Sequence, residues 1–168
     1  MNIHPAFVHF PIALLTVYGV FECFRWRKLL VLESWTIVKA VLLWVGVIGA
    51  FFALQTGDVA ESFHRNQRAL VDVHSSFATA TTIIFGVVAV YYVLKIGDSY
   101  FRKISLGKKY ERFVLNILKI QKVFKTPIVI VLALAGLVTL VITGALGASI
   151  VYGPDVDPIV SFTYHLFF

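Results

Sequence analysis

Residues 127–152 read PIVIVLALAGLVTLVITGALGASIVY, a run of 26 residues without a charged side chain. A helix needs about 20 apolar residues to cross the hydrocarbon core of a bilayer. Three further apolar runs of similar length lie at residues 5–24, 36–55 and 73–94. We therefore predict a polytopic membrane protein in which four helices cross the bilayer.

The composition excludes a soluble globular domain and a nucleic-acid-binding protein. Of the 168 residues, 59% are apolar and 14% are charged, and the mean hydropathy is +0.86. Soluble domains carry charges at about a quarter of their positions. The formal net charge of +6 comes from the connections between the apolar runs, where membrane proteins keep their basic residues. The single cysteine, Cys23, excludes an internal disulfide and a cysteine-rich metal site.

The distribution of basic residues predicts how the chain is oriented. Thirteen lysine and arginine residues flank the first and third connections, whereas only Arg65 and Arg68 lie in the second and none follows the last run. Connections rich in lysine and arginine stay on the cytoplasmic side. We predict a multi-pass protein of the cytoplasmic inner membrane, with both termini and the second connection on the outer, periplasmic side.

Small residues predict how the helices associate. They recur four residues apart on three of the runs, at Gly49, Ala53 and Gly57, at Ala78, Thr82 and Gly86, and at Gly144 and Ala148. Such stripes let helix backbones approach closely in lipid. The expected fold class is all-α: residues 1–153 form an antiparallel four-transmembrane-helix bundle, and an outer tail follows at residues 154–168.

The connection between the third and fourth runs, residues 95–126, is long and basic. From Lys108 to Lys125 its apolar residues stand at helical spacing, at Phe113, Ile117, Ile120 and Phe124. This pattern favours an amphipathic helix that lies on the anionic lipids of the inner leaflet. A helix that docks a cytoplasmic partner is the alternative.

All five histidines fall at or beyond the outer ends of the predicted helices: His4, His9, His64, His74 and His165. Histidine is a common ligand of haem and of transition metals. His9 lies near the start of the first run, two residues before Pro11, which cannot donate a helical hydrogen bond and bends a helix. His74 lies at the start of the third run, which enters the membrane from the same side. The two side chains can therefore lie at one depth and hold a haem iron from both faces.

Residues near these histidines suit the same site. Arg65 and Arg68 could pair with haem propionates, and Asp72 could accept a hydrogen bond from a ligating imidazole. The alternatives are an interfacial anchor for the two arginines and, for His9, a hydrogen bond to a neighbouring helix. A zinc or copper site is a further alternative. The spacing of the histidines does not favour it, because His4 and His9 lie about 140° apart around a helix.

Glu22 is an ionisable residue near the inner end of the first run. It can pair with Arg25 or Lys39, and we interpret it as a structural ion pair rather than a functional group. Lys39 can instead extend toward the lipid headgroups. The sequence holds no phosphate-binding loop, nucleophile elbow or metalloprotease motif, so we do not predict that the chain is an enzyme by itself.

The first run also carries a motif. HPAFVHFPIALL at residues 4–15 resembles the opening signature H-P-x-x-V-H-F-P-I-A-L of a bacterial membrane family known as domain of unknown function 2231. Further family features follow in the same order along the chain, at Thr56, Gly57, His74, Gly144, Gly147, Val151, Tyr152 and Gly153. The resemblance covers about residues 4–153 and implies the four-helix fold. It also implies a role for His4, His9, Pro11 and His74, and the family's association with cytochromes and iron–sulfur proteins implies electron transfer.

These observations together predict a small b-type cytochrome-like electron-transfer protein. It would bind haem b near the outer membrane face through His9 and His74, with His4 as an alternative ligand. Its partners would be a periplasmic electron carrier and either another redox subunit or the quinone pool. One alternative is a cofactor-free accessory subunit of a larger membrane redox or photosynthetic complex, and another is an outer-face zinc- or copper-binding protein.

Overall fold

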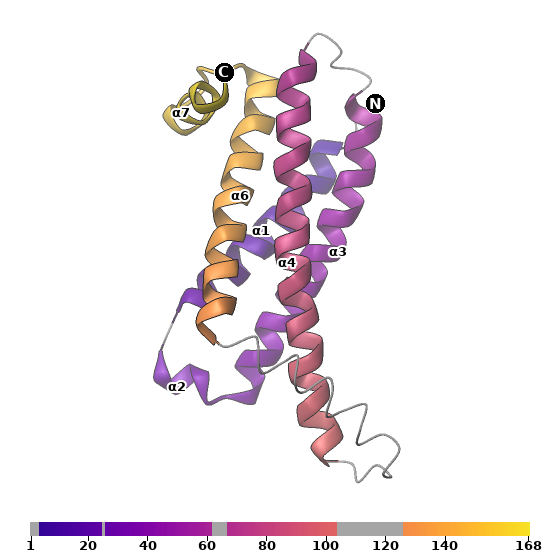
Figure 1. The fold of residues 1–168 in the computed structure, drawn as a ribbon, viewed down its shortest axis with the longest axis vertical. Helices are drawn as coiled ribbons and strands as arrows, with labels where there is room; N and C mark the ends of the chain where they lie inside the picture. Colours follow the sequence, from indigo (N-terminus) through magenta and orange to yellow (C-terminus); the bar gives the residue numbers. More distant parts are fainter. Residues whose placement is uncertain (1–3, 25, 62–66, 104–125) are drawn as a thin grey trace.

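The computed structural model describes four ranges of the chain, and every regular element in them is a helix (Figure 1): residues 4–24, 26–61, 67–103 and 126–168. The elements are α1 (His4–Cys23), α2 (Arg27–Leu30), α3 (Glu33–Glu61), α4 (Arg68–Lys103), α6 (Thr126–Tyr152) and α7 (Pro158–Phe167). The predicted all-α class is confirmed for these ranges. The basic segment from Lys108 to Lys125, for which we predict an amphipathic helix, lies outside them.

Among the described residues, three helices are long and apolar enough to cross a membrane. Their spanning segments are Glu33–Gly57, Arg68–Gly97 and Pro127–Tyr152. The apolar stretch of α1, Phe7–Cys23, is shorter, so the first of the four predicted spans stays a prediction. Both α3 and α4 extend past the predicted spans at both ends. Hydropathy marks only the part of a helix that suits hydrocarbon, whereas backbone hydrogen bonding continues through the polar turns beyond it.

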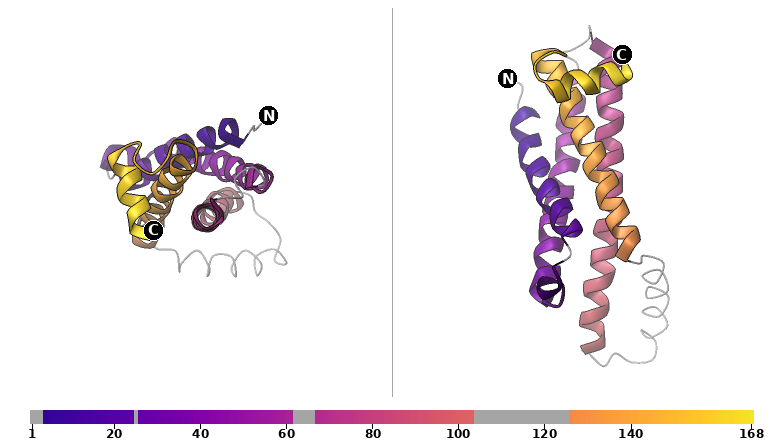
Figure 2. Two further views of the ribbon diagram at one scale, coloured as in Figure 1. Left: turned by 90° about the horizontal axis from the view of Figure 1, so that it is seen from above. Right: turned by 90° about the vertical axis from the view of Figure 1, so that its left-hand side faces the viewer.

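Consecutive long helices run antiparallel, and α1 and α4 lie at opposite corners of the group (Figures 1 and 2). Helices α3 and α6 each pack against both α1 and α4. Across the middle, α1 and α4 meet through long side chains. We name the two ends of this arrangement from the sequence. At the histidine end α1 and α4 begin and α3 and α6 finish, and at the basic end the reverse holds.

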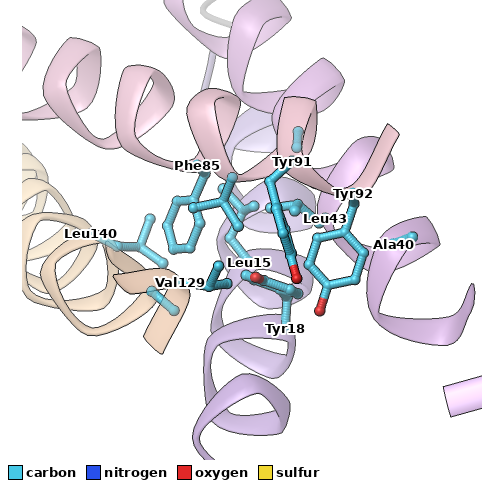
Figure 3. Packing of buried hydrophobic residues seen from close by; sticks show 12 residues of the cluster. Leu15, Tyr18, Ala40, Leu43, Phe85, Tyr91, Tyr92, Val129 and Leu140 are labelled. Carbon is cyan, nitrogen blue, oxygen red and sulfur yellow. The ribbon is translucent and has the colours of Figure 1, made fainter. Parts of the chain in front are cut away.

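The main core lies toward the basic end, where all four long helices contribute side chains (Figure 3). The ring of Tyr18 on α1 meets those of Phe85 and Tyr92 on α4 edge to face, with centroids 6.0 Å apart in each pair. Apolar side chains also cover the outside of the helices, as at Ile83 and Val131, which are 60% and 63% exposed. Helices that are apolar on every side suit a lipid surrounding.

Glycines set the closest approaches between helices, although not all at the predicted positions. A β-carbon on Gly49 would lie 3.2 Å from Pro11 of α1, so the predicted packing is confirmed there. It is wrong at Gly86 and Gly144, where a β-carbon would meet no described atom within 4 Å. The close contacts lie instead at other glycines, where a β-carbon would come within 2.6–2.7 Å of a side chain on a neighbouring helix: Gly19, Gly46 and Gly136.

The predicted tail, residues 154–168, contains a helix. Gly153 ends α6 with a φ of 93°, a conformation that glycine adopts without strain, and its N–H donates to the carbonyl of Ser149 at 3.0 Å. The carboxylate of Asp157 then accepts from the backbone N–H groups of Ile159 and Val160, at 2.8 and 3.0 Å, and caps the start of α7. As a result α7 folds back against α6.

Candidate functional site

His74 is held against α6 at the histidine end. Its Nδ1 lies 2.9 Å from the carbonyl oxygen of Thr143, and its side chain is half-buried. A carbonyl oxygen only accepts hydrogen bonds, so in the neutral ring Nδ1 carries the hydrogen. The lone pair of the neutral imidazole is then on Nε2, the nitrogen through which a histidine in this tautomer binds a metal.

Gly147 makes room for this imidazole. A β-carbon at position 147 would lie 3.1 Å from Cε1 and 3.5 Å from Nδ1 of His74. The first distance is shorter than ordinary contact between carbon atoms, which is about 3.5–4.0 Å. The ring therefore sits against the bare backbone of α6, one turn beyond the carbonyl that accepts its hydrogen bond.

His9 and His74 lie on α1 and α4, two helices at opposite corners of the group. His9 lies on α1 with an exposed side chain, and α1 packs mainly on α3 and α6. Helix α1 continues through Pro11, which is buried against Gly49 of α3. The site shared by His9 and His74 therefore stays a prediction. The contacts of His74 support only the role of His74 in it.

The other predicted site residues are spread over the histidine end. Arg68 and Asp72 lie in the first turns of α4 with exposed side chains, and His165 lies exposed on α7. The acceptor placed at Nδ1 of His74 is the Thr143 carbonyl rather than the predicted Asp72. No group of three or more histidine, cysteine, aspartate or glutamate side chains in the described ranges could hold a metal ion. Three predicted residues have side chains outside the described part: His4, His64 and Arg65.

A second polar cluster lies at the basic end and joins three helices. Glu22 of α1 accepts from Lys39 Nζ of α3 at 2.7 Å and from the Tyr92 hydroxyl of α4 at 2.5 Å, both through Oε2. Glu22 and Lys39 are each 4% exposed, and Tyr92 is 1% exposed. The predicted pairing of Glu22 with Lys39 is confirmed. The alternative, in which Lys39 extends to the headgroups, is wrong because its ammonium turns inward to a buried carboxylate that would otherwise lack a counter-charge.

Aromatic rings lie beside this cluster, and Figure 3 draws those of Tyr18, Tyr91 and Tyr92. The ammonium of Lys39 lies 5.6 Å from the centre of the Tyr92 ring, and the rings of Tyr91 and Tyr92 meet edge to face at 5.5 Å. Tyr18 is fully buried, yet its hydroxyl has no hydrogen-bond partner among the described residues. We did not predict either Tyr18 or Tyr92 as part of the cluster. The signal was available for Tyr18, which stands one helical turn before Glu22 and so shares its face.

A comparison with known families agrees with the membrane character of the chain. The family model described as "Predicted membrane protein (DUF2231)" matches residues 1–157. No curated protein and no solved structure gives a significant match. The match covers all of α1 to α6 and confirms the resemblance carried by residues 4–15. The chain belongs to the DUF2231 family of predicted membrane proteins.

Proposed function

We propose that this protein is an integral membrane haem protein that transfers single electrons, with His74 as an axial ligand of haem b at the histidine end. The observation that carries the proposal is the contact between Nδ1 of His74 and the Thr143 carbonyl. Imidazoles that bind metals nearly always donate their other N–H to a carbonyl, carboxylate or water. That hydrogen bond fixes the orientation of the ring and makes the ligating nitrogen more basic. Both effects favour His74 as a metal ligand.

The second axial ligand in this proposal is His9, with His4 as the alternative. Both belong to α1, which begins at the same end as α4. Arg68, and Arg65 in the adjoining connection, are the basic groups at this end that could pair with propionates. Bound haem would supply the one-electron chemistry, and the chain would supply the ligands, the apolar surroundings and the orientation. A periplasmic carrier and a redox subunit or the quinone pool are the partners that this chemistry requires.

We also propose that α1 crosses the membrane, which gives four spans in the inner membrane and places both termini outside. Support comes from the surface of α1, where Phe10 and Val20 are 60% and 53% exposed, as on the neighbouring helices. The segment Phe7–Cys23 spans about 25 Å as a helix, and the turn before it adds the missing length. Labelling single cysteines with a membrane-impermeant maleimide in whole cells tests this topology. Labelling near His165 but not near Lys28 supports it.

The absorption spectrum of the purified protein tests haem binding. After expression with a haem precursor and purification in mild detergent, we expect a Soret band and a spectral change on reduction with dithionite. The His74→Ala variant should lose the band, whereas His165→Ala, which removes an exposed histidine of α7, should keep it. A wild-type protein without a Soret band overturns the proposal. A band that survives both His74→Ala and His9→Ala overturns the ligand assignment.

A cofactor-free accessory subunit of a larger membrane redox complex is the second candidate. The observation that favours it is the open surface at Gly86 of α4 and Gly144 of α6, which no described helix of this chain covers. Small residues on an open helix surface suit close contact with another membrane helix. Migration in mild detergent far above the 18.8 kDa of one chain, with defined co-purifying subunits and no Soret band, would support this candidate.

A further inference from the structure

Helix α7 has three distinct faces. Val160 and Thr163 are buried against the protein, at 3% and 5% exposure. Three large apolar side chains point away from the protein with 63%, 70% and 62% exposure: Ile159, Phe162 and Leu166. Ser161 and His165 form the remaining, polar side.

Helical geometry separates these faces. At about 100° per residue, Ile159, Phe162 and Leu166 fall within about 60° of one another. The centre of this apolar face lies about 100° from the buried face and about 110° from the polar one. A helix with these three faces can contact protein, lipid and water at the same time if it lies along a membrane surface.

The position of α7 fits such a surface. It lies crosswise at the histidine end, beside the end of α6, and its C-terminus points toward the viewer of Figure 1, as both views of Figure 2 show. In a right-handed helix seen from its C-terminus, successive residues turn counter-clockwise toward the viewer. With Val160 and Thr163 directed at α6, the apolar face then falls on the side of the membrane-spanning body. The polar face falls on the side away from it.

The level of the membrane surface is set by α6. Its membrane-capable segment ends at Tyr152, and the last two residues, Val151 and Tyr152, are 60% and 74% exposed. The start of α7 follows after a connection of five residues, 153–157. The ring of Phe167 in α7 also lies 5.2 Å from that of Phe77 in α4. The apolar face of α7 therefore lies at the level where the membrane-capable segment of α6 ends, and aromatic side chains gather here as they do at bilayer interfaces.

We propose that α7 is an interfacial helix that lies in the headgroup layer at the histidine end. Ile159, Phe162 and Leu166 insert among the acyl chains, and Ser161 and His165 face water. The family match ends at residue 157, before α7 begins, so this membrane contact belongs to a part of the chain that the family model does not describe. It does not depend on haem binding or on which side of the membrane the histidine end faces.

Spin-label accessibility tests this proposal. In a Cys23→Ala background, single cysteines replace Phe162 and Leu166 on the apolar face, and Ser161 and His165 serve as matched positions on the same helix. The labelled proteins are reconstituted in vesicles of phosphatidylcholine and phosphatidylglycerol. Collisions with oxygen, which concentrates in lipid, are compared with collisions with a water-soluble nickel chelate. We expect a several-fold higher oxygen-to-nickel ratio at Phe162→Cys and Leu166→Cys than at Ser161→Cys and His165→Cys.

Two results would overturn the proposal. Equal nickel accessibility at all four positions would mean that α7 lies in water. Protection of positions 162 and 166 from both reagents would mean that protein, such as a second copy of this chain, covers the apolar face. Both of these side chains are exposed, so their replacement leaves the helix packing unchanged, and elution of each variant at the volume of the Cys23→Ala parent checks this.

Discussion

The two ends of this protein use their polar residues in opposite ways. At the basic end a buried carboxylate, an ammonium and a phenol come from three helices and satisfy one another. At the histidine end Nδ1 of His74 is bonded to the backbone carbonyl of Thr143 while its side chain is half-buried, and His9 has an exposed side chain. Buried charges that pair with each other within the fold have a structural role. A half-buried imidazole whose Nδ1 hydrogen is fixed by a carbonyl has the tautomer in which Nε2 can bind a metal, and this is why the proposed function lies at the histidine end.

The largest effect should follow from breaking the ion pair at the basic end. Replacing Glu22 with leucine leaves the Lys39 ammonium buried without its carboxylate, which should destabilise the protein by about 3–5 kcal/mol. The midpoint of thermal or SDS-induced unfolding in detergent measures this loss.

The double variant separates the cost of an unpaired charge from the value of the pair. Glu22→Leu combined with Lys39→Met removes both charges and should recover most of the lost stability, because apolar residues replace a buried pair at little cost. Lys28→Met, at an exposed lysine of α2, should leave the midpoint unchanged. A double variant as unstable as Glu22→Leu alone would contradict the role assigned to this pair.

Two tyrosines of the core provide a second, smaller test. Tyr92→Phe removes a hydrogen bond to the Glu22 carboxylate and should cost about 1.5–3 kcal/mol. Tyr18→Phe removes a buried hydroxyl without a described partner, so stability should stay the same or rise. Both variants keep the ring, and unfolding of the two in parallel isolates the hydroxyl. Equal losses of stability in the two variants would contradict the difference in hydrogen bonding between the Tyr92 and Tyr18 hydroxyls.

The sequence located the long helices but did not predict α2, α7 or the contacts between helices. The apolar run at residues 127–152 predicted the end of α6 at about Tyr152, because length and the absence of charge are local properties of the sequence. Stripes of small residues did not predict which glycines pack, because every stripe has several faces and only tertiary structure decides which one meets a neighbour. Gly86 is open, whereas Gly136 faces the ring of Phe85.

Gly136 and Gly86 allow a matched pair of alanine substitutions that tests the packing of the core. A β-carbon at Gly136 would lie 2.7 Å from Cζ of Phe85, a fully buried ring, so Gly136→Ala should cost about 1–3 kcal/mol. Gly86→Ala meets nothing and should gain up to about 1 kcal/mol from the better helix propensity of alanine. Opposite shifts in the unfolding midpoint are expected. Two shifts of the same sign would contradict the packing of α4 on α6 near Phe85.

The candidate site was predictable in part. Residue type and position singled out His74, because a histidine at the start of an apolar run is rare enough to notice. Its partner could not be found that way, since the acceptor is the backbone carbonyl of Thr143 and every residue has one. The cluster at the basic end was also predictable in part. The pairing of Glu22 with Lys39 followed from their opposite charges. The contact with the Tyr92 hydroxyl did not, because it depends on how α4 is rotated about its axis, which the sequence does not show.

The smallest expected effect tests the histidine end directly. A β-carbon at Gly147 would lie 3.1 Å from Cε1 of His74, so Gly147→Ala should move the imidazole by a few tenths of an ångström and weaken its bond to Thr143. The gain in helix propensity offsets this loss, and the net change in stability should stay below about 1 kcal/mol. The nitrogen NMR signals of His74 should nevertheless shift in Gly147→Ala and stay in place in Gly144→Ala, where the β-carbon meets open space. If both variants leave the signals in place, the imidazole does not lie on Gly147. The hydrogen bond that carries the haem proposal would then lose its support, although the basic end would keep its ion pair.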